Sequence, residues 1–73
     1  MAQRINRGLV DAIYDAIDTG TALNIDTERR VYEDCAVLRT SDSHVTVSAF
    51  DAVKDVMREY DIAWESIQAV EQF

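Results

Sequence analysis

The stretch from residue 29 to residue 48, RRVYEDCAVLRTSDSHVTVS, carries the clearest structural signal in this 73-residue chain. Residues 29–40 include two valines, a tyrosine and a leucine with no glycine or proline, which is typical of a β-strand. Residues 41–43 (SDS) favour a turn, and residues 44–48 (HVTVS) alternate between polar and apolar side chains. The stretch therefore predicts an antiparallel β-hairpin.

Two registers are compatible with this hairpin. A four-residue loop sets Ala36 and Leu38 opposite the valines of HVTVS, whereas a three-residue loop sets Cys35 and Val37 opposite them. A slip of one residue exchanges the two faces of a strand. We favour the second register because it gathers the apolar side chains on one face: Val31, Cys35, Val37, Val45 and Val47.

The residues before the hairpin predict a helix and a short strand. In residues 5–18, Ile5, Leu9, Ile13 and Ile17 recur every four positions, which indicates an amphipathic helix. Asn6 is a candidate N-cap, and residues 19–20 (TG) are a good helix stop. Residues 21–26 (TALNID) alternate and predict a short strand.

The residues after the hairpin predict helical structure over 49–72. Apolar residues recur there at spacings of three and four, namely Phe50, Val53, Met57, Tyr60, Trp64 and Ile67. Ser48 followed by Asp51 resembles a capping box. Two alternatives stay open, because residues 49–72 form either one long bent helix or two helices, with Asp61 capping the second at 62–72.

The predicted fold class is α+β in a single domain over residues 1–73. It has an N-terminal helix, a small antiparallel sheet of two or three strands, and one or two C-terminal helices packed on the sheet.

Composition and charge restrict the function. The chain carries fourteen acidic and seven basic residues, for a net charge of −7, and residues 11–28 hold five acids with no base. Phosphate contacts need a basic footprint, so we expect no direct nucleic-acid binding and no anionic membrane. The charge favours a basic protein surface instead. No apolar run approaches the roughly 20 residues of a membrane helix, and we expect a cytoplasmic protein.

The inventory of reactive residues does not suggest an enzyme. Cys35 is the single cysteine and His44 the single histidine, and either hairpin register offsets the two along the ladder. The chain has no cluster with metal-ligand spacing, and its two glycines do not make a phosphate-binding loop. We therefore expect no catalytic residue, no metal and no cofactor.

The candidate binding residues are acidic. Asp11, Asp15 and Asp18 lie four and then three positions apart, so a helix stacks their carboxylates on one face, where like charges repel. Only Arg7 lies within reach of this ladder, beside Asp11. A second row, at i, i+4 and i+8, is partly neutralised by Lys54 and Arg58. The further candidate residues are Asp26 and Glu28, the second row of Asp51, Asp55 and Glu59, and Trp64 as an aromatic anchor.

Three interpretations of the ladder compete. It is a solvated face, an adaptation to high salt, or a mimic of nucleic-acid charge presented to a basic cleft. Nine aspartates against five glutamates and a single lysine fit the second interpretation.

A short acidic chain with a first helix, a small sheet and C-terminal helices resembles several phage-encoded anti-CRISPR proteins. The resemblance covers the predicted topology and the acidity of the whole chain, and it rests on no motif, so no residue is carried over. Arg29 and Arg30 depart from a purely acidic mimic. The resemblance implies an inhibitor or modulator that occupies a nucleic-acid site on an effector in the host cytoplasm.

Two alternatives to inhibition follow from the residues. One is a structural protein of a halophile or virus that forms a homodimer through an exposed apolar face. The other is a helix-turn-helix DNA binder at residues 53–70, although the second helix of that motif would carry no Lys or Arg.

Overall fold

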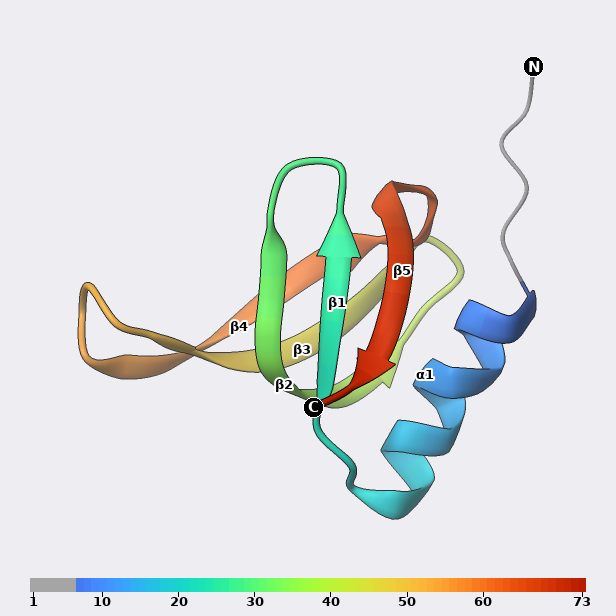
Figure 1. Cartoon of the computed structure of the whole chain (residues 1–73), viewed down its shortest axis with the longest axis horizontal. Coiled ribbons are helices and arrows are strands. Elements are labelled where there is room, and N and C mark those ends of the chain that lie inside the picture. Colours follow the sequence, from blue (N-terminus) through green and yellow to red (C-terminus); the bar gives the residue numbers. More distant parts are fainter. Residues whose placement is uncertain (1–6) are drawn as a thin grey trace.

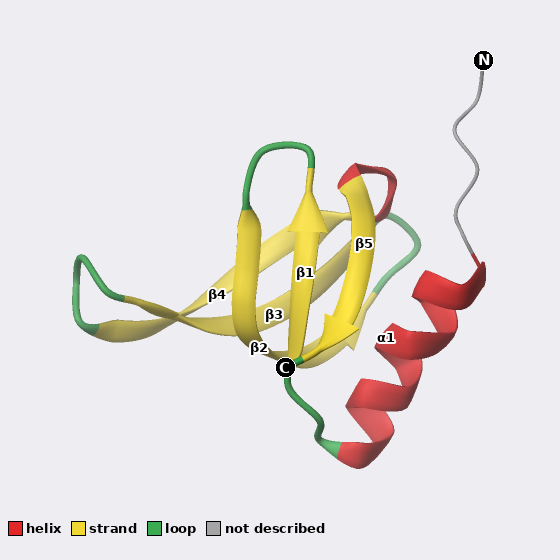
Figure 2. Cartoon of the chain, viewed as in Figure 1, coloured by secondary structure: helices red, strands yellow, loops and turns green. Residues whose placement is uncertain are grey.

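The computed structural model describes residues 7–73 and shows one α-helix followed by five antiparallel strands (Figures 1 and 2). The elements in chain order are α1 (Arg7–Thr19), β1 (Leu23–Thr27), β2 (Val31–Thr40), β3 (His44–Asp51), β4 (Val56–Ala63), the 3-10 helix η1 (Trp64–Ser66) and β5 (Ile67–Gln72). The strand order is β4-β3-β2-β1-β5, so β5 crosses over to pair with β1. Strands β4 and β5 are the two edges of the sheet.

Helix α1 confirms the helix predicted before the hairpin, although Ile17 of the predicted stripe is 37% exposed and Ile5 lies outside the described residues. Ile13 and Ala16 are buried, and α1 contacts β2 and β5. The helix ends as expected, because Gly20 has a φ of 72° and its N–H donates to the carbonyl of Ala16 at 2.9 Å. The candidate cap Asn6 lies outside the described residues, as does the side chain of Arg7.

Strand β2 bends between its two neighbours. Its first half pairs with β1 and its second half with β3. Between Leu23↔Cys35 and Ile25↔Tyr32 it holds one residue more than β1, and within that bulge Asp34 has a φ of 52°. The N–H of Asp34 donates to Oδ1 of Asn24 at 3.0 Å. Such a bulge bends a strand, and here it curves the sheet around its core.

The core lies inside the curved sheet and beneath α1. The largest fully buried side chains are Ile13, Ile25, Cys35, Val45 and Val47. Four of the five residues that the favoured hairpin register gathered on one face are buried, but Val31 is 49% exposed. The pairing follows the favoured register only in part, because Cys35 pairs with Leu23 of β1 and not with a valine of β3. Val37 opposes Val47, and a second bulge in β2 then sets Arg39 opposite Thr46.

The C-terminal part of the predicted fold is wrong. Residues 49–72 form the end of β3, then β4, η1 and β5, so the sheet has five strands and no helix packs on it from the C-terminal side. Asp61 lies within β4 and caps no helix. The helix-turn-helix interpretation of 53–70 loses its basis, because that segment is mainly strand.

The physical reason is a second periodicity in the same residues. Along β4, Tyr60 and Ile62 are more buried than Glu59 and Asp61, which is the alternation of a strand. Spacings of three and four coexist with this period of two. Strand β3 decides between them, because it pairs with β4 continuously from His44↔Ala63 to Asp51↔Val56.

The β3–β4 hairpin is long and twisted, and it extends past the rest of the sheet (Figure 1). Its outer end carries apolar side chains whose exposed fractions range from 48% to 94%: Phe50, Val53, Val56 and Met57. This hairpin arm is the most apolar exposed feature that the described residues form.

Candidate functional site

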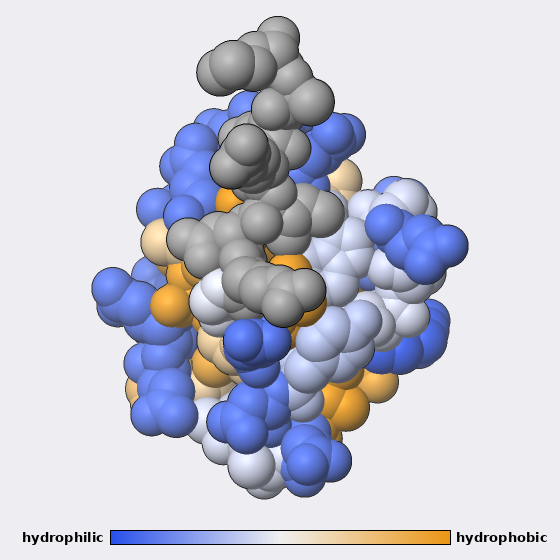
Figure 3. All heavy atoms as spheres, turned by 90° about the vertical axis from the view of Figure 1, so that its right-hand side faces the viewer, coloured by the Kyte–Doolittle hydropathy of each residue, from blue (hydrophilic) through white to orange (hydrophobic). Residues whose placement is uncertain are grey.

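The three carboxylates of the predicted ladder lie on the solvent side of α1. Asp11, Asp15 and Asp18 are all exposed, while Ile13 and Ala16 hold the opposite side of the helix against the sheet. No ion pair to any of the three occurs among the residues that the structure describes. Figure 3 looks onto this side of the molecule and shows hydrophilic residues surrounding smaller hydrophobic areas. The helical stacking expected from the sequence is therefore present.

Asp26 and Glu28 lie away from that ladder. Asp26 is half-buried in β1, where it lines a shallow groove of about 220 Å³ together with Glu33 and Glu71. Glu28 is exposed in the β1–β2 turn, and its N–H donates to the carbonyl of Ser66 at 3.2 Å. The structure thus places Asp26 on the sheet and Glu28 in the β1–β2 turn, rather than beside α1.

The second row of acids does not exist as a row. Asp51 ends β3, Asp55 lies in the following turn and Glu59 lies on β4, so the predicted helical spacing is wrong. Glu59 forms an exposed ion pair with Arg39 at 3.4 Å. Asp55 has a φ of 57°, a conformation that aspartate tolerates better than most residues.

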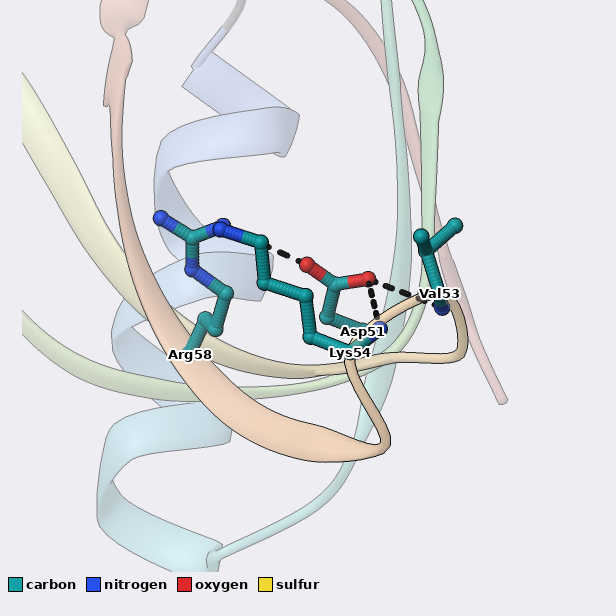
Figure 4. Close-up of polar contacts among 4 residues, drawn as sticks. All are labelled: Asp51, Val53, Lys54 and Arg58. Atoms are coloured by element: carbon teal, nitrogen blue, oxygen red, sulfur yellow. Dashed lines mark hydrogen bonds and ion pairs between the residues drawn. The ribbon is translucent and has the colours of Figure 1, made fainter.

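Asp51 organises the β3–β4 turn (Figure 4). Its Oδ1 accepts hydrogen bonds from the N–H groups of Val53 at 3.0 Å and Lys54 at 3.2 Å, and its Oδ2 lies 3.3 Å from Nη1 of Arg58. The hydrogen bond from the Lys54 N–H is the main cause that lowers the pKa of this carboxyl, and Arg58 adds to it. The capping box predicted from Ser48 and Asp51 is wrong, because no helix begins there, and Asp51 instead accepts hydrogen bonds from two N–H groups of a turn.

Trp64 fastens η1 to the rest of the fold. Its Nε1–H donates to the carbonyl of Ser41 at 2.8 Å, and its ring centroid lies 6.3 Å from that of Tyr14 on α1. The side chain is half-buried. Through these contacts Trp64 stabilises the fold, whether or not it also contacts a partner.

Sequence reasoning missed a cluster of aromatic and cationic side chains. The rings of Tyr32 and Tyr60 meet edge to face at 5.3 Å, and Cζ of Arg30 lies 4.4 Å from the first centroid and 5.2 Å from the second. Arg30 and Tyr32 stand two positions apart, which is the spacing of one strand face. The spacing of Arg30 and Tyr32 was visible in the sequence. Tyr60 reaches these two side chains only because β4 pairs with the sheet.

Cys35 and His44, the two residues considered for catalysis, have different environments. Cys35 is buried, and burial raises the pKa of its thiol to about 11, so it is a poor nucleophile. His44 is exposed, and its Nδ1 shares a hydrogen bond of 2.6 Å with Oγ of Ser43. Within residues 7–73, no three His, Cys, Asp or Glu side chains converge as a metal site would require.

Across the same residues, no helix has both the length and the apolar character needed to cross a bilayer.

Comparisons with protein-family models, with curated proteins and with solved structures find no match for this chain.

Proposed function

We propose that this protein is a non-enzymatic binding module that docks on a basic surface of a nucleic-acid-handling protein through the acidic face of α1. One observation carries the proposal. Asp11, Asp15 and Asp18 are exposed on one helix face with no described cation beside them, whereas both ion pairs in the described part of the chain neutralise other acids, Asp51 and Glu59.

The ladder costs the folded protein stability that a partner would restore. Like charges one helical turn apart are unfavourable by about 0.2–0.5 kcal/mol per pair. A basic cleft removes that repulsion on binding. Because Ile13 and Ala16 fix α1 to the sheet, the carboxylates also lose little freedom when they bind.

The spacing of the ladder supports a partial resemblance to a phosphate backbone. The helical rise separates the first two carboxylates by about 6 Å and the next two by about 4.5 Å along the axis. One DNA strand carries a charge about every 3.4 Å. The ladder therefore carries fewer charges per unit length than one DNA strand, so it imitates only a few phosphates, and the function that we propose for it is inhibition of the cleft that holds them.

Affinity capture with a matched pair of variants tests this proposal. The first variant, Asp11→Asn with Asp15→Asn and Asp18→Asn, removes the ladder. The control variant, Glu33→Gln with Asp42→Asn and Glu71→Gln, removes the same charge from exposed positions elsewhere. Wild type and control should retain a nucleic-acid-binding protein from a prokaryotic lysate at moderate salt, and the ladder variant should lose it. Equal retention by the ladder variant contradicts the proposal.

Self-association is a second candidate function, and the sheet edges favour it. Strands β4 and β5 each have one described neighbour, so each presents a row of backbone donors and acceptors that another strand can pair. Pairing of β4 on one copy with β5 on the next is heterologous and builds a closed ring or a filament. The apolar end of the arm, including Met57 at 60% exposure, adds burial to such a contact.

Light scattering over a range of micromolar concentrations tests this second function. Assembly through β4 predicts a mass above that of one chain, and Met57→Lys should lower it. A single-chain mass at every concentration contradicts self-association.

A further inference from the structure

A cleft of about 300 Å³ opens where the β1–β2 turn meets the end of β4 and η1. Ile62 and Ala63 of β4 and the half-buried ring of Tyr32 give it an apolar side. The hydrogen bond from the N–H of Glu28 to the carbonyl of Ser66 ties the two sides of the cleft together. The cleft is therefore built from backbone that the fold itself fixes, and no residue of α1 lines it.

The charged residues around the cleft are mainly acidic. Glu28, Asp61 and Glu65 line it together with one base, Arg29. A second base, Arg30, borders it over the ring of Tyr32. The side chains of Glu28 and Glu65 make no hydrogen bond or ion pair to the described residues. Asp61 uses Oδ1 to accept the hydroxyl of Thr46 at 2.7 Å, which orients the carboxylate and leaves Oδ2 without a partner in the described part of the chain.

These features select among ligand classes. Ligand pockets for drug-sized molecules span about 300–1,000 Å³, so this cleft has the size for a single side chain or a small fragment. Three carboxylates repel a phosphate or a nucleotide. A purely apolar ligand would bury carboxylates without a counter-charge. A ligand with one positive charge and a flat or apolar body satisfies both sides of the cleft.

We propose that this cleft binds an arginine side chain presented by a peptide segment of a partner protein. Its guanidinium donates hydrogen bonds in a planar fork to the carboxylates and stacks on an aromatic ring, which an ammonium does less well. Arg30 makes this kind of contact within the chain, with its Cζ 4.4 Å from the centroid of Tyr32, so an incoming guanidinium competes with Arg30 for that ring. The assignment stands independently of the proposed docking face on α1.

A titration of isotope-labelled protein, followed by NMR chemical shifts, tests this assignment. The probes are three short neutral-background peptides that differ only at one central residue: arginine, lysine or citrulline. Citrulline keeps the shape of arginine and removes its charge. The arginine peptide should shift and saturate the amide signals of residues 27–32 and 61–66, and the citrulline peptide should bind about fivefold or more weakly.

Two variants locate the binding. Glu65→Gln should weaken the arginine peptide about two- to fivefold, and Tyr32→Phe should leave its affinity unchanged within twofold because the ring is kept. The ladder variant of Asp11, Asp15 and Asp18 serves as the control and should bind the peptide as wild type does. Loss of peptide binding in that control would show that the ladder, and not the cleft, attracts the cation.

Besides that outcome of the control, three results with the wild-type protein overturn the assignment. They are equal binding of the citrulline peptide, equal binding of the lysine peptide, and shifts that spread over all exposed acids without saturation. None of them bears on the docking of α1, so failure here is distinguishable from failure of the proposed function.

Discussion

The bend of β2 at Asp34 allows a sharp test of how the sheet is built. Asp34 has a φ of 52°, whereas its exposed neighbour Glu33 lies in the same strand without a positive φ. Valine and glycine should therefore rank in opposite order at these two positions. Valine and glycine at residue 34 both keep the N–H that donates to Oδ1 of Asn24, so that hydrogen bond does not confound the comparison.

The magnitudes follow from backbone sterics. At residue 34, a left-handed conformation costs an L-residue about 1–2 kcal/mol, and a β-branched side chain suffers most. Asp34→Gly relieves that strain. Glycine also raises the conformational entropy of the unfolded chain, which lowers the free energy of unfolding by about 0.5–1 kcal/mol, so the stability of this variant should stay near that of wild type. Asp34→Val should lose about 1 kcal/mol, because aspartate already bears part of the left-handed cost and tolerates this conformation better than a β-branched residue does. At residue 33, glycine should cost about 0.5–1 kcal/mol, and valine should be neutral or favourable.

Urea unfolding followed by circular dichroism measures all four variants. A loss of 1 kcal/mol corresponds to about 4–8 °C in Tm for a domain of this size, so thermal unfolding gives an independent reading. The result that refutes the reasoning is the same order, valine above glycine, at both positions. That result would mean that residue 34 is ordinary strand and that the sheet curves for another reason.

Three further predictions concern single side chains. Trp64→Phe removes the donor to the carbonyl of Ser41 and should lower the free energy of unfolding by about 1 kcal/mol, measured by urea titration; an unchanged midpoint would show that the hydrogen bond contributes nothing. The pKa of Asp51 is lowered in the folded state, so its stabilising effect is present above the ordinary value of 3.8 and is lost as the pH falls through the folded pKa. Wild type should thus lose stability below about pH 4 more steeply than Asp51→Asn, and parallel pH profiles of the urea midpoint would contradict this. Cys35 is fully buried with a raised pKa of about 11, so a disulfide reagent should label it at neutral pH only as fast as the protein opens; labelling at the rate of a free thiol would place it at the surface.

The N-terminal half of the fold was predictable because its local signals agree with one another. The helix has one apolar face and ends at a glycine. From Gly20 to residue 48, segments typical of strands are separated by turn residues. Gly20 and the buried valines Val45 and Val47 behave as their positions predict. The register was not predictable, because the bulges at Asp34 and Leu38 carry no glycine to announce them.

The C-terminal half was predicted wrongly because its residues satisfy two periods. Tyr60 and Trp64 fit a helical stripe, yet Tyr60 and Ile62 also fit one face of a strand. The local sequence does not show that β3 supplies a partner strand over its whole length. The cleft that we propose to bind arginine could not be predicted for the same reason. Its residues Tyr32, Asp61 and Glu65 meet only through the pairing of β4 and the return of η1 to the β1–β2 turn.

The most direct test of the central claim is a competition between this protein and duplex DNA for the captured partner. The proposed docking of Asp11, Asp15 and Asp18 predicts mutually exclusive binding, so saturating DNA should displace the wild-type protein, and the ladder variant should fail to displace DNA. A ternary complex of partner, DNA and wild-type protein would contradict the account, because the acidic face of α1 would then lie outside the nucleic-acid site.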